Sequence, residues 1–188
     1  EKGLHIDKDH FMTISPDEGS MNRAIYLANV LGVDMGMYYK RLDYSRYVNG
    51  RHPIAAYEFL GPKIEGKDMI LIDDMISSGD TIIKIASLLK EKGAGRVYIC
   101  STFGFFTDGL DKFDDAYKKG YFDKLLTTNL VYQSPELLEK PYYISCDMSK
   151  YIALIIDTLN HDTSVSHLLN PVDRIKRCVT NYMSQHEK

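Results

Sequence analysis

Two patterns of apolar residues alternate along the chain. Short apolar runs, such as "FMTIS" at residues 11–15 and "DMILID" at 68–73, are typical of strands buried on both faces of a sheet. Between these runs, apolar residues recur every three or four positions, which is the spacing of an amphipathic helix. The runs predict strands at 11–15, 33–40, 54–61, 68–73, 96–102, 124–129 and 142–146. The periodic segments predict helices at 21–31, from 82 to a stop at Gly93, around 109–119 and at 148–159.

Strands that alternate with helices predict an α/β fold with a parallel sheet and helices on both of its faces. Residues 41–53, "RLDYSRYVNGRHP", follow neither pattern; they are polar, basic and aperiodic, so we expect a long exposed loop. A length of 188 residues suits one domain. The basic segment after "NPVD" (170–173) is expected to form a peripheral helix. We therefore divide the chain into a main domain at 1–169 and a helical tail at 170–188.

The overall charge of the chain argues against one class of partner. A formal net charge of -3 lacks the basic footprint of non-specific nucleic-acid binding. No apolar run reaches the ~20 residues of a membrane span. Cys100, Cys146 and Cys178 lie far apart, which argues against a disulfide framework or zinc site and favours the cytoplasm. Because the chain starts with Glu1 and not methionine, we expect it to be a piece of a longer protein.

The stretch "LIDDMISSGDT" at residues 71–81 combines two acids with a run of small residues. In an open parallel sheet, ligands bind beyond the carboxyl ends of the strands. The small residues lead into a helix, whose N-terminal N–H groups attract phosphate, whereas the acids suit sugar hydroxyls or a divalent cation. The two ends together fit a ribose 5-phosphate. The alternative is a purely structural strand end followed by a serine-rich helix cap, and the stretch is not a P-loop because it lacks Gly-Lys-[Ser/Thr].

The segment "ILIDDMISSGDTI" resembles the phosphoribosyl-diphosphate loop of the type I phosphoribosyltransferases. Elsewhere in the chain, "ISPDEGSMNRAIYLANVLGVDMGMYYKR", "GRVYICSTFGFF", "TTN" and "SVSHLL" resemble the ribose-phosphate pyrophosphokinase family, in the same order. The resemblance runs from about Phe11 to Leu169 and corresponds to the C-terminal half of such a synthetase. It implies the phosphoribosyltransferase-like fold and transfer of the diphosphate of ATP to ribose 5-phosphate, with release of AMP.

The resemblance also implies roles for the residues of this loop. Asp73 and Asp74 would bind the ribose hydroxyls. The 5-phosphate would be held by the residues that follow, which are Ser77, Ser78, Gly79, Asp80 and Thr81. Asp80 departs from the family, which usually has glycine there; because a carboxylate repels a phosphate, we expect this side chain to turn outward or cap the helix. Thr81 alone could equally be a helix cap.

A second loop, "SPDEGS", resembles the family segment that holds the diphosphate being transferred. Asp17 would ligate Mg²⁺, and the backbone N–H groups of Glu18, Gly19 and Ser20 would lie near the phosphates. The alternative interpretation of Asp17 is an N-cap for the helix that follows. Arg23 could be a surface residue on that helix.

The basic segment "KRLDYSR" resembles the start of the family's catalytic loop. Lys40 matches its transition-state lysine, with Arg41 beside it. The family carries arginine two residues after the lysine, where this chain has Leu42. Arg41 and Arg46 are the candidates to take its place. Without such a replacement, the change argues against catalysis.

The resemblance extends to regulation and partners. Ser164, Ser166 and the neighbouring His167 match a segment that helps bind regulatory phosphate or ADP at a subunit contact, although a capped surface turn also explains them. We expect ATP and ribose 5-phosphate as substrates, Mg²⁺ as cofactor, and a homo-oligomer that includes an N-terminal half. Two alternatives stay open: a free-standing phosphoribosyltransferase, although no base-recognising hood segment is seen, and a non-catalytic regulatory paralogue, which Leu42 favours.

Overall fold

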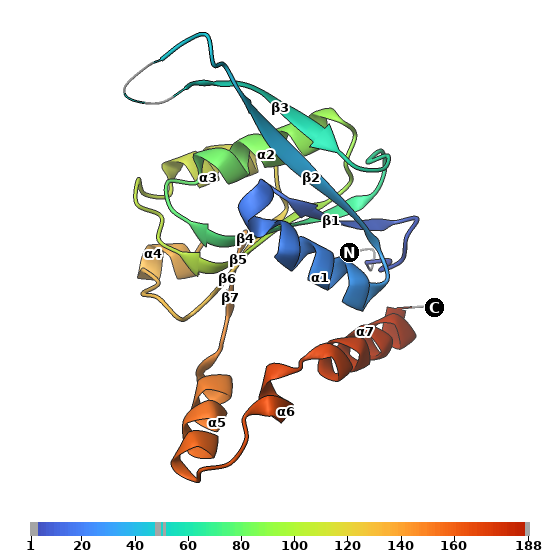
Figure 1. The fold of residues 1–188 in the computed structure, drawn as a ribbon, viewed down its shortest axis with the longest axis vertical. Helices are drawn as coiled ribbons and strands as arrows, with labels where there is room; N and C mark the ends of the chain where they lie inside the picture. Colours follow the sequence, from blue (N-terminus) through green and yellow to red (C-terminus); the bar gives the residue numbers. More distant parts are fainter. Residues whose placement is uncertain (1–3, 48–49, 51, 187–188) are drawn as a thin grey trace.

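The computed structural model describes residues 4–47, 50 and 52–186 and contains a seven-stranded sheet (Figure 1). Its strands are β1 (Phe11–Ser15), β2 (Asp34–Leu42), β3 (Ile54–Leu60), β4 (Asp68–Ile76), β5 (Val97–Gly104), β6 (Lys124–Thr128) and β7 (Tyr143–Cys146). The helices are η1 (Glu18–Ser20), α1 (Met21–Leu31), α2 (Asp80–Glu91), α3 (Asp111–Lys118), α4 (Pro135–Leu138), α5 (Ser149–Asn160), α6 (Ser166–Leu169) and α7 (Val172–His186). The strands lie in the order β3-β2-β1-β4-β5-β6-β7, and all neighbours are parallel except β2 and β3.

The antiparallel edge of the sheet differs from the sequence prediction. The predicted loop at 41–53 begins later, because Arg41 and Leu42 belong to β2 and pair with β3. The register shifts between these two residues, which marks a bulge. Polar residues are compatible with a strand here because this hairpin lies at the edge of the sheet, partly exposed. Residues 48, 49 and 51 of the predicted loop lie outside the described residues.

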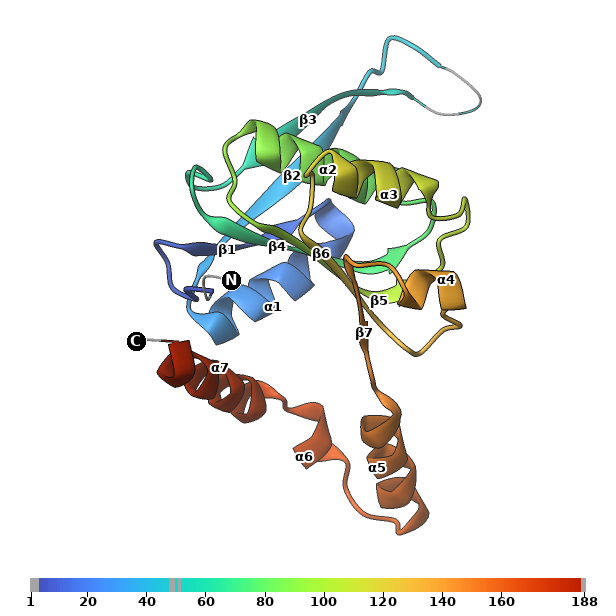
Figure 2. The same cartoon turned by 180° about the vertical axis from the view of Figure 1, so that it is seen from behind.

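Helices cover both faces of the sheet, as the sequence predicted. Figures 1 and 2 show α1 on one face and α2 with α3 on the other. The larger buried cluster joins apolar residues of the central strands, among them Met69, Leu71 and Ile99, to Ile85 of α2 and Phe113 of α3. A smaller cluster under α1 contains Phe11, Ala28 and Val33. The apolar runs of the central strands therefore correspond to strands that helices cover on both faces.

The C-terminal segment leaves the sheet after β7 (Figure 1). Its last helix, α7, confirms the predicted helical tail and returns to the N-terminal region, where Tyr182 Oη accepts a hydrogen bond from Leu4 N at 2.7 Å. In α5, by contrast, several large apolar side chains are exposed, including Ile156 and Leu159. Within the described residues, no helix is both long and apolar enough to cross a membrane.

The order of the strands creates a point where successive connections diverge. β1 lies between β2 and β4, and the chain leaves β1 through α1 on one face but leaves β4 through α2 on the other. The carboxyl ends of β1 and β4 therefore border an open crevice, which is where ligands bind in open α/β sheets. Both loops singled out in the sequence follow these two strands.

Phe113 supports the loop after β4 from the α3 side. Its side chain is fully buried, and its ring lies against Phe106 with centroids 5.1 Å apart. Phe113→Ala should lower the free energy of unfolding by about 3–5 kcal/mol, because it removes a buried ring and leaves a cavity. Urea denaturation followed by circular dichroism measures this. Phe113→Leu, the control, should cost clearly less, and equal losses for both variants would contradict the packing role.

Candidate functional site

The two acids lie within β4 and not at its end. The sequence predicted that the strand stops at Asp73, but it continues to Ile76 because β5 keeps pairing with it, with Ile76 opposite Gly104. On its other side, β4 loses its partner early, since the last pair with β1 joins Ile14 and Leu71. Asp73 and Asp74 therefore lie on a strand that is held on one side and open to the crevice on the other.

Asp73 is tied to the loop that follows β1. Ser20 is almost fully buried, and its Oγ donates a hydrogen bond to Asp73 Oδ1 at 2.6 Å. The backbone N–H of Asp74 donates to the same oxygen at 2.9 Å. Burial raises the pKa of Asp73, whereas the hydrogen bonds from Ser20 and from the backbone N–H of Asp74 oppose this rise. The side chain of Asp74 and the carboxylate of Asp17 raise this pKa further. The charged form is thus costly in the free protein.

Asp74 has a different neighbour. Its Oδ2 lies 3.6 Å from Nη2 of Arg23, on the first turns of α1. Arg23, which the sequence analysis considered as a surface residue, therefore has a carboxylate partner. Asp73 and Asp74 thus contact neighbouring parts of one segment, because Ser20 is the N-cap residue of α1 and Arg23 lies on that helix.

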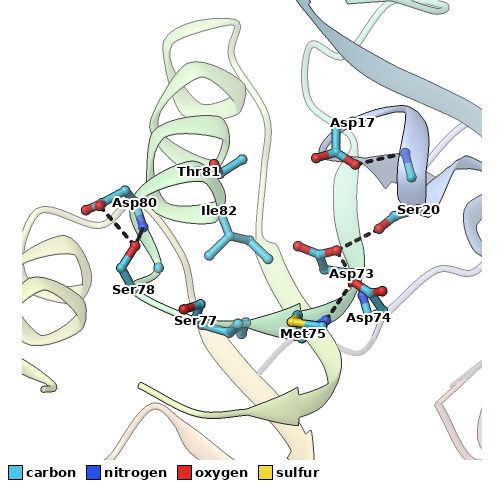
Figure 3. A pocket seen from close by; sticks show the side chains of 13 residues that line it. Asp17, Ser20, Asp73, Asp74, Met75, Ser77, Ser78, Asp80, Thr81 and Ile82 are labelled. Carbon is cyan, nitrogen blue, oxygen red and sulfur yellow. Dashed lines mark hydrogen bonds between the residues drawn. The ribbon is translucent and has the colours of Figure 1, made fainter. Parts of the chain in front are cut away.

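The acids and the small-residue loop surround a single cavity of about 360 Å³ (Figure 3). The predicted site residues that line it are Asp17, Gly19, Ser20, Asp73, Asp74, Ser77, Ser78, Gly79, Asp80 and Thr81. Figure 3 shows the acids on one side of this space and the start of α2 on the other. The spatial arrangement that the sequence predicted, acids at one end and a small-residue loop at the other, is therefore present.

Gly79 shapes the end of the cavity that α2 provides. It occupies the N-cap position of α2 with φ +86°, a backbone conformation that favours glycine. A side chain there would also clash with the ring of Phe113. Because the first N–H groups of a helix lack intrahelical acceptors, those of Thr81 and Ile82 are suited to bind an anion. Thr81 itself is not the cap, so its hydroxyl is not used in that role.

The side chains of Ser78 and Asp80 contact each other. Ser78 Oγ donates to Asp80 Oδ2 at 3.0 Å, and Lys112 of α3 donates to Asp80 Oδ1 at 2.7 Å. Figure 3 shows that the Asp80 carboxylate points away from the acids. The expectation that Asp80 turns outward is thus confirmed. Ser77 lies nearer the middle of the cavity, with its Oγ 3.4 Å from Thr107 Oγ1.

Asp17 joins the first cavity to a second one. It caps η1, with Oδ1 accepting from Gly19 N at 3.0 Å. The alternative interpretation made it the cap of the longer helix that follows, but the N-cap residue of α1 is Ser20, so that interpretation is wrong. Its Oδ2 accepts a hydrogen bond from Lys40 Nζ at 2.9 Å. The second cavity, also about 360 Å³, is lined by Asp17, Glu18, Gly19, Lys40 and Leu42. Lys40 and the "SPDEGS" loop are therefore neighbours, and Leu42 lines the same cavity.

Three candidate residues lie elsewhere. Arg41 points its Nε to Oε1 of Glu58 on β3, 2.8 Å away, and lines neither cavity. Ser164 and Ser166 hydrogen-bond to each other, with Oγ atoms 3.0 Å apart, at the start of α6. This turn belongs to the C-terminal segment, away from α2 (Figure 1). The side chain of His167 lies outside the described part of the structure.

The acids of the site cannot enclose a cation by themselves. Among the described residues, no group of three or more His, Cys, Asp or Glu side chains is arranged to hold a metal ion. Mg²⁺, however, commonly uses one or two carboxylates and completes its shell with substrate phosphates and water. The Asp17 carboxylate, at the junction of the two cavities, fits that requirement.

Sequence reasoning missed three contacts of the site. These are the hydroxyl of Ser20 on Asp73, the guanidinium of Arg23 beside Asp74, and the ammonium of Lys112 on Asp80. Only Arg23 carried a signal in the sequence, because it lies one helical turn after the "SPDEGS" loop. The other two depend on segments that the fold brings together.

The chain is similar to one family of proteins. The model of the phosphoribosyl synthetase-associated domain matches residues 51–170, a range that includes both acids and the small-residue loop but not Asp17 or Lys40. The ribose-phosphate pyrophosphokinase of Vibrio parahaemolyticus is 29% identical over 163 residues, which cover 86% of this chain and 49% of that protein. That of Thermococcus kodakarensis is 31% identical over 121 residues, or 64% of this chain and 39% of the relative.

A solved structure has the same fold. The crystal structure of phosphoribosylpyrophosphate synthetase from Mycobacterium smegmatis matches with a TM-score of 0.67 and 24% identity, covering 81% of this chain and 45% of that one. The predicted phosphoribosyltransferase-like α/β fold is thereby confirmed. The chain spans about half the length of the curated relatives it matches.

Asp73 should make the fold less stable at neutral pH. The pKa of Asp73 is higher in the folded protein than in the unfolded chain, so the folded protein binds this proton more tightly. The free energy of unfolding therefore falls as the pH rises from the pKa of the unfolded chain through that of the folded protein. Asp73→Asn should therefore raise the unfolding midpoint at pH 7. The gain should vanish below the unfolded pKa of about 3.9, where the carboxyl is protonated in both states.

Thermal unfolding of both proteins across this pH range measures the effect. Asp9→Asn is the control; because this residue is exposed and does not line the cavity, we expect a change within about 0.5 kcal/mol. An unchanged or lower midpoint for Asp73→Asn at pH 7 would contradict the prediction.

Proposed function

The chain belongs to the phosphoribosyl synthetase-associated domain family, and from this premise we propose that it works as the C-terminal half of a ribose-phosphate diphosphokinase. The observation that carries the proposal is the single cavity with Asp73 and Asp74 at one side and the N-terminus of α2 at the other. Vicinal hydroxyls and a phosphate at opposite ends of one ligand match these two environments.

In this proposal each loop binds one part of the substrates. Asp73 and Asp74 accept hydrogen bonds from the ribose hydroxyls. The 5-phosphate binds the N–H and hydroxyl groups of residues 77–81. The diphosphate of ATP would lie beside Glu18, Gly19 and Ser20, where Asp17 would hold Mg²⁺. When bound, Mg²⁺ would neutralise charge on the diphosphate.

The reaction that we propose moves a diphosphoryl group. The anomeric hydroxyl oxygen of ribose 5-phosphate bonds to the β-phosphorus of ATP, the bond from that phosphorus to the α,β-bridging oxygen breaks, and AMP leaves while the hydroxyl proton is released. Such transfers depend on positioning and charge neutralisation. Lys40 would supply positive charge to the transferring phosphates, and for this it must leave Asp17, its partner at 2.9 Å.

A second candidate function is a regulatory subunit without activity. Leu42 lines the cavity of Lys40, where the family's arginine would supply charge, and Arg41 is paired with Glu58 instead. Both observations favour a site that binds substrates but transfers the diphosphate poorly. The cavity around Asp73 is compatible with either function, so activity measurements distinguish them.

The sugar-binding role is tested by calorimetric titration with ribose 5-phosphate. We expect the 188-residue chain to bind it, and Asp73→Asn with Asp74→Asn to weaken binding by at least about tenfold, because hydrogen bonds to charged groups contribute about 1.5–3 kcal/mol each. Asp9→Asn with Asp162→Asn removes the same charge from the exposed surface and is the control. Equal affinity in both double variants would refute the assignment, as would a crystal with the phosphate bound only beside residues 40–46.

Catalysis is tested by AMP release from ATP and ribose 5-phosphate. We expect the isolated chain to be inactive, because it lacks the other half of the longer relatives and positioning of two substrates can account for ~7–11 kcal/mol of a barrier. In a protein with both halves, Lys40→Ala should lower turnover by about 10²-fold or more and leave ribose 5-phosphate binding nearly intact. Full turnover by the isolated chain would contradict the proposal. An inactive two-half protein that Leu42→Arg activates would instead favour the regulatory subunit.

A further inference from the structure

The phosphate end of the cavity carries a negative charge of its own. Asp80 is the first residue of α2, and it lines the same cavity as Ser77, Gly79 and Thr81. A carboxylate aimed at this space would repel a phosphate dianion. Binding of a phosphate to this loop therefore requires contacts that hold the Asp80 carboxylate away from the anion.

Lys112 of the neighbouring helix α3 makes such contacts. Its Nζ donates to Asp80 Oδ1 at 2.7 Å and to Asp108 Oδ2 at 2.9 Å. The other oxygen of Asp80 accepts from Ser78 at 3.0 Å, so both carboxylate oxygens have donors on the outer side of the loop. Figure 3 shows the result, with the Asp80 carboxylate turned away from the acids across the cavity.

The charges of this pair are stable at neutral pH. The hydrogen bond from Lys112 lowers the pKa of Asp80, and the hydrogen bonds to Asp80 and Asp108 raise the pKa of Lys112. Both groups are therefore ionised at neutral pH. Phe113, the next residue of α3, is fully buried against the loop and anchors the helix that carries Lys112.

We propose that Lys112 is a positioning residue for phosphate binding: it holds the Asp80 carboxylate outside the cavity and offsets its charge. This inference rests on the proposed function, because it concerns the 5-phosphate end of the same site. Its effect should appear in ligand affinity and hardly in stability. Both partners are well exposed, and exposed ion pairs contribute little to folding.

The test is a double-mutant cycle with ribose 5-phosphate as the calorimetric probe. Lys112→Met frees Asp80 and should weaken binding by at least about threefold, within the range that neighbouring residues show in such cycles. Asp80→Gly should bind at least as tightly as the unchanged chain. In the Asp80→Gly background, Lys112→Met should have little further effect, because the carboxylate that it controls is gone. If Lys112 acted only through the stability of the fold, Lys112→Met would weaken binding equally with and without Asp80.

Lys118→Met is the matched control, since it removes the same charge from the same helix α3. It should leave affinity within about twofold, and thermal unfolding should show that all variants are folded. Two results overturn the inference alone: an unchanged affinity in Lys112→Met, or an equal loss with and without Asp80. If the unchanged chain fails to bind ribose 5-phosphate at all, the proposed function falls, and this inference falls with it.

Discussion

The pairing of β1 with β4 ends at Leu71, while the pairing of β5 with β4 continues to Ile76. This difference in length is the constraint on which the site depends. It leaves residues 72–76 of the strand open on one side, and these residues include the two acids. The loop after β1 then fills part of the space that a longer β1 would have occupied, which brings Ser20 against Asp73.

The electrostatics of the crevice follow from the same arrangement. Three carboxylates, those of Asp17, Asp73 and Asp74, line one cavity, while Lys40 and Arg23 offset them only in part. Their mutual repulsion and the burial of Asp73 make the free site costly to charge. In the proposed function, the hydroxyl groups of the sugar relieve that cost, and its phosphate binds separately, at the N-terminus of α2. Separate environments for opposite chemical groups also orient the ligand.

Much of the architecture could be predicted from the sequence because apolar runs and helical periodicity report burial directly. The acids and the small loop were found for a related reason: they interrupt an apolar strand just before a periodic helix. The length of β4 was not predictable in this way, since its last residues are held by β5 and not by their own pattern. Arg41 was misjudged as part of a loop because its partner, Glu58, is defined only by the antiparallel hairpin.

The contacts of Ser20 and Lys112 escaped prediction for a physical reason. They join residues 53 and 32 positions apart, and no local pattern encodes such a pair. Asp80 illustrates how far the sequence alone can predict a side-chain contact. The sequence identified it as an unfavourable charge and predicted its direction, but the cation that holds it could only be seen in the folded chain.

The long separation between Ser20 and Asp73 also has a consequence for the folding of the chain. β4, α2 and β5 are consecutive in the sequence, so they can associate through local contacts. β1 and β4 are separated in the sequence by α1, β2 and β3, and pairing between such distant strands is slow. Until that step is complete, Asp73 lacks its serine and the cavity has only one wall. A chain in which β1 has not paired with β4 would therefore lack the complete cavity. A ligand that recognises only the completed crevice stabilises the entire sheet by mass action, including strands that it never touches.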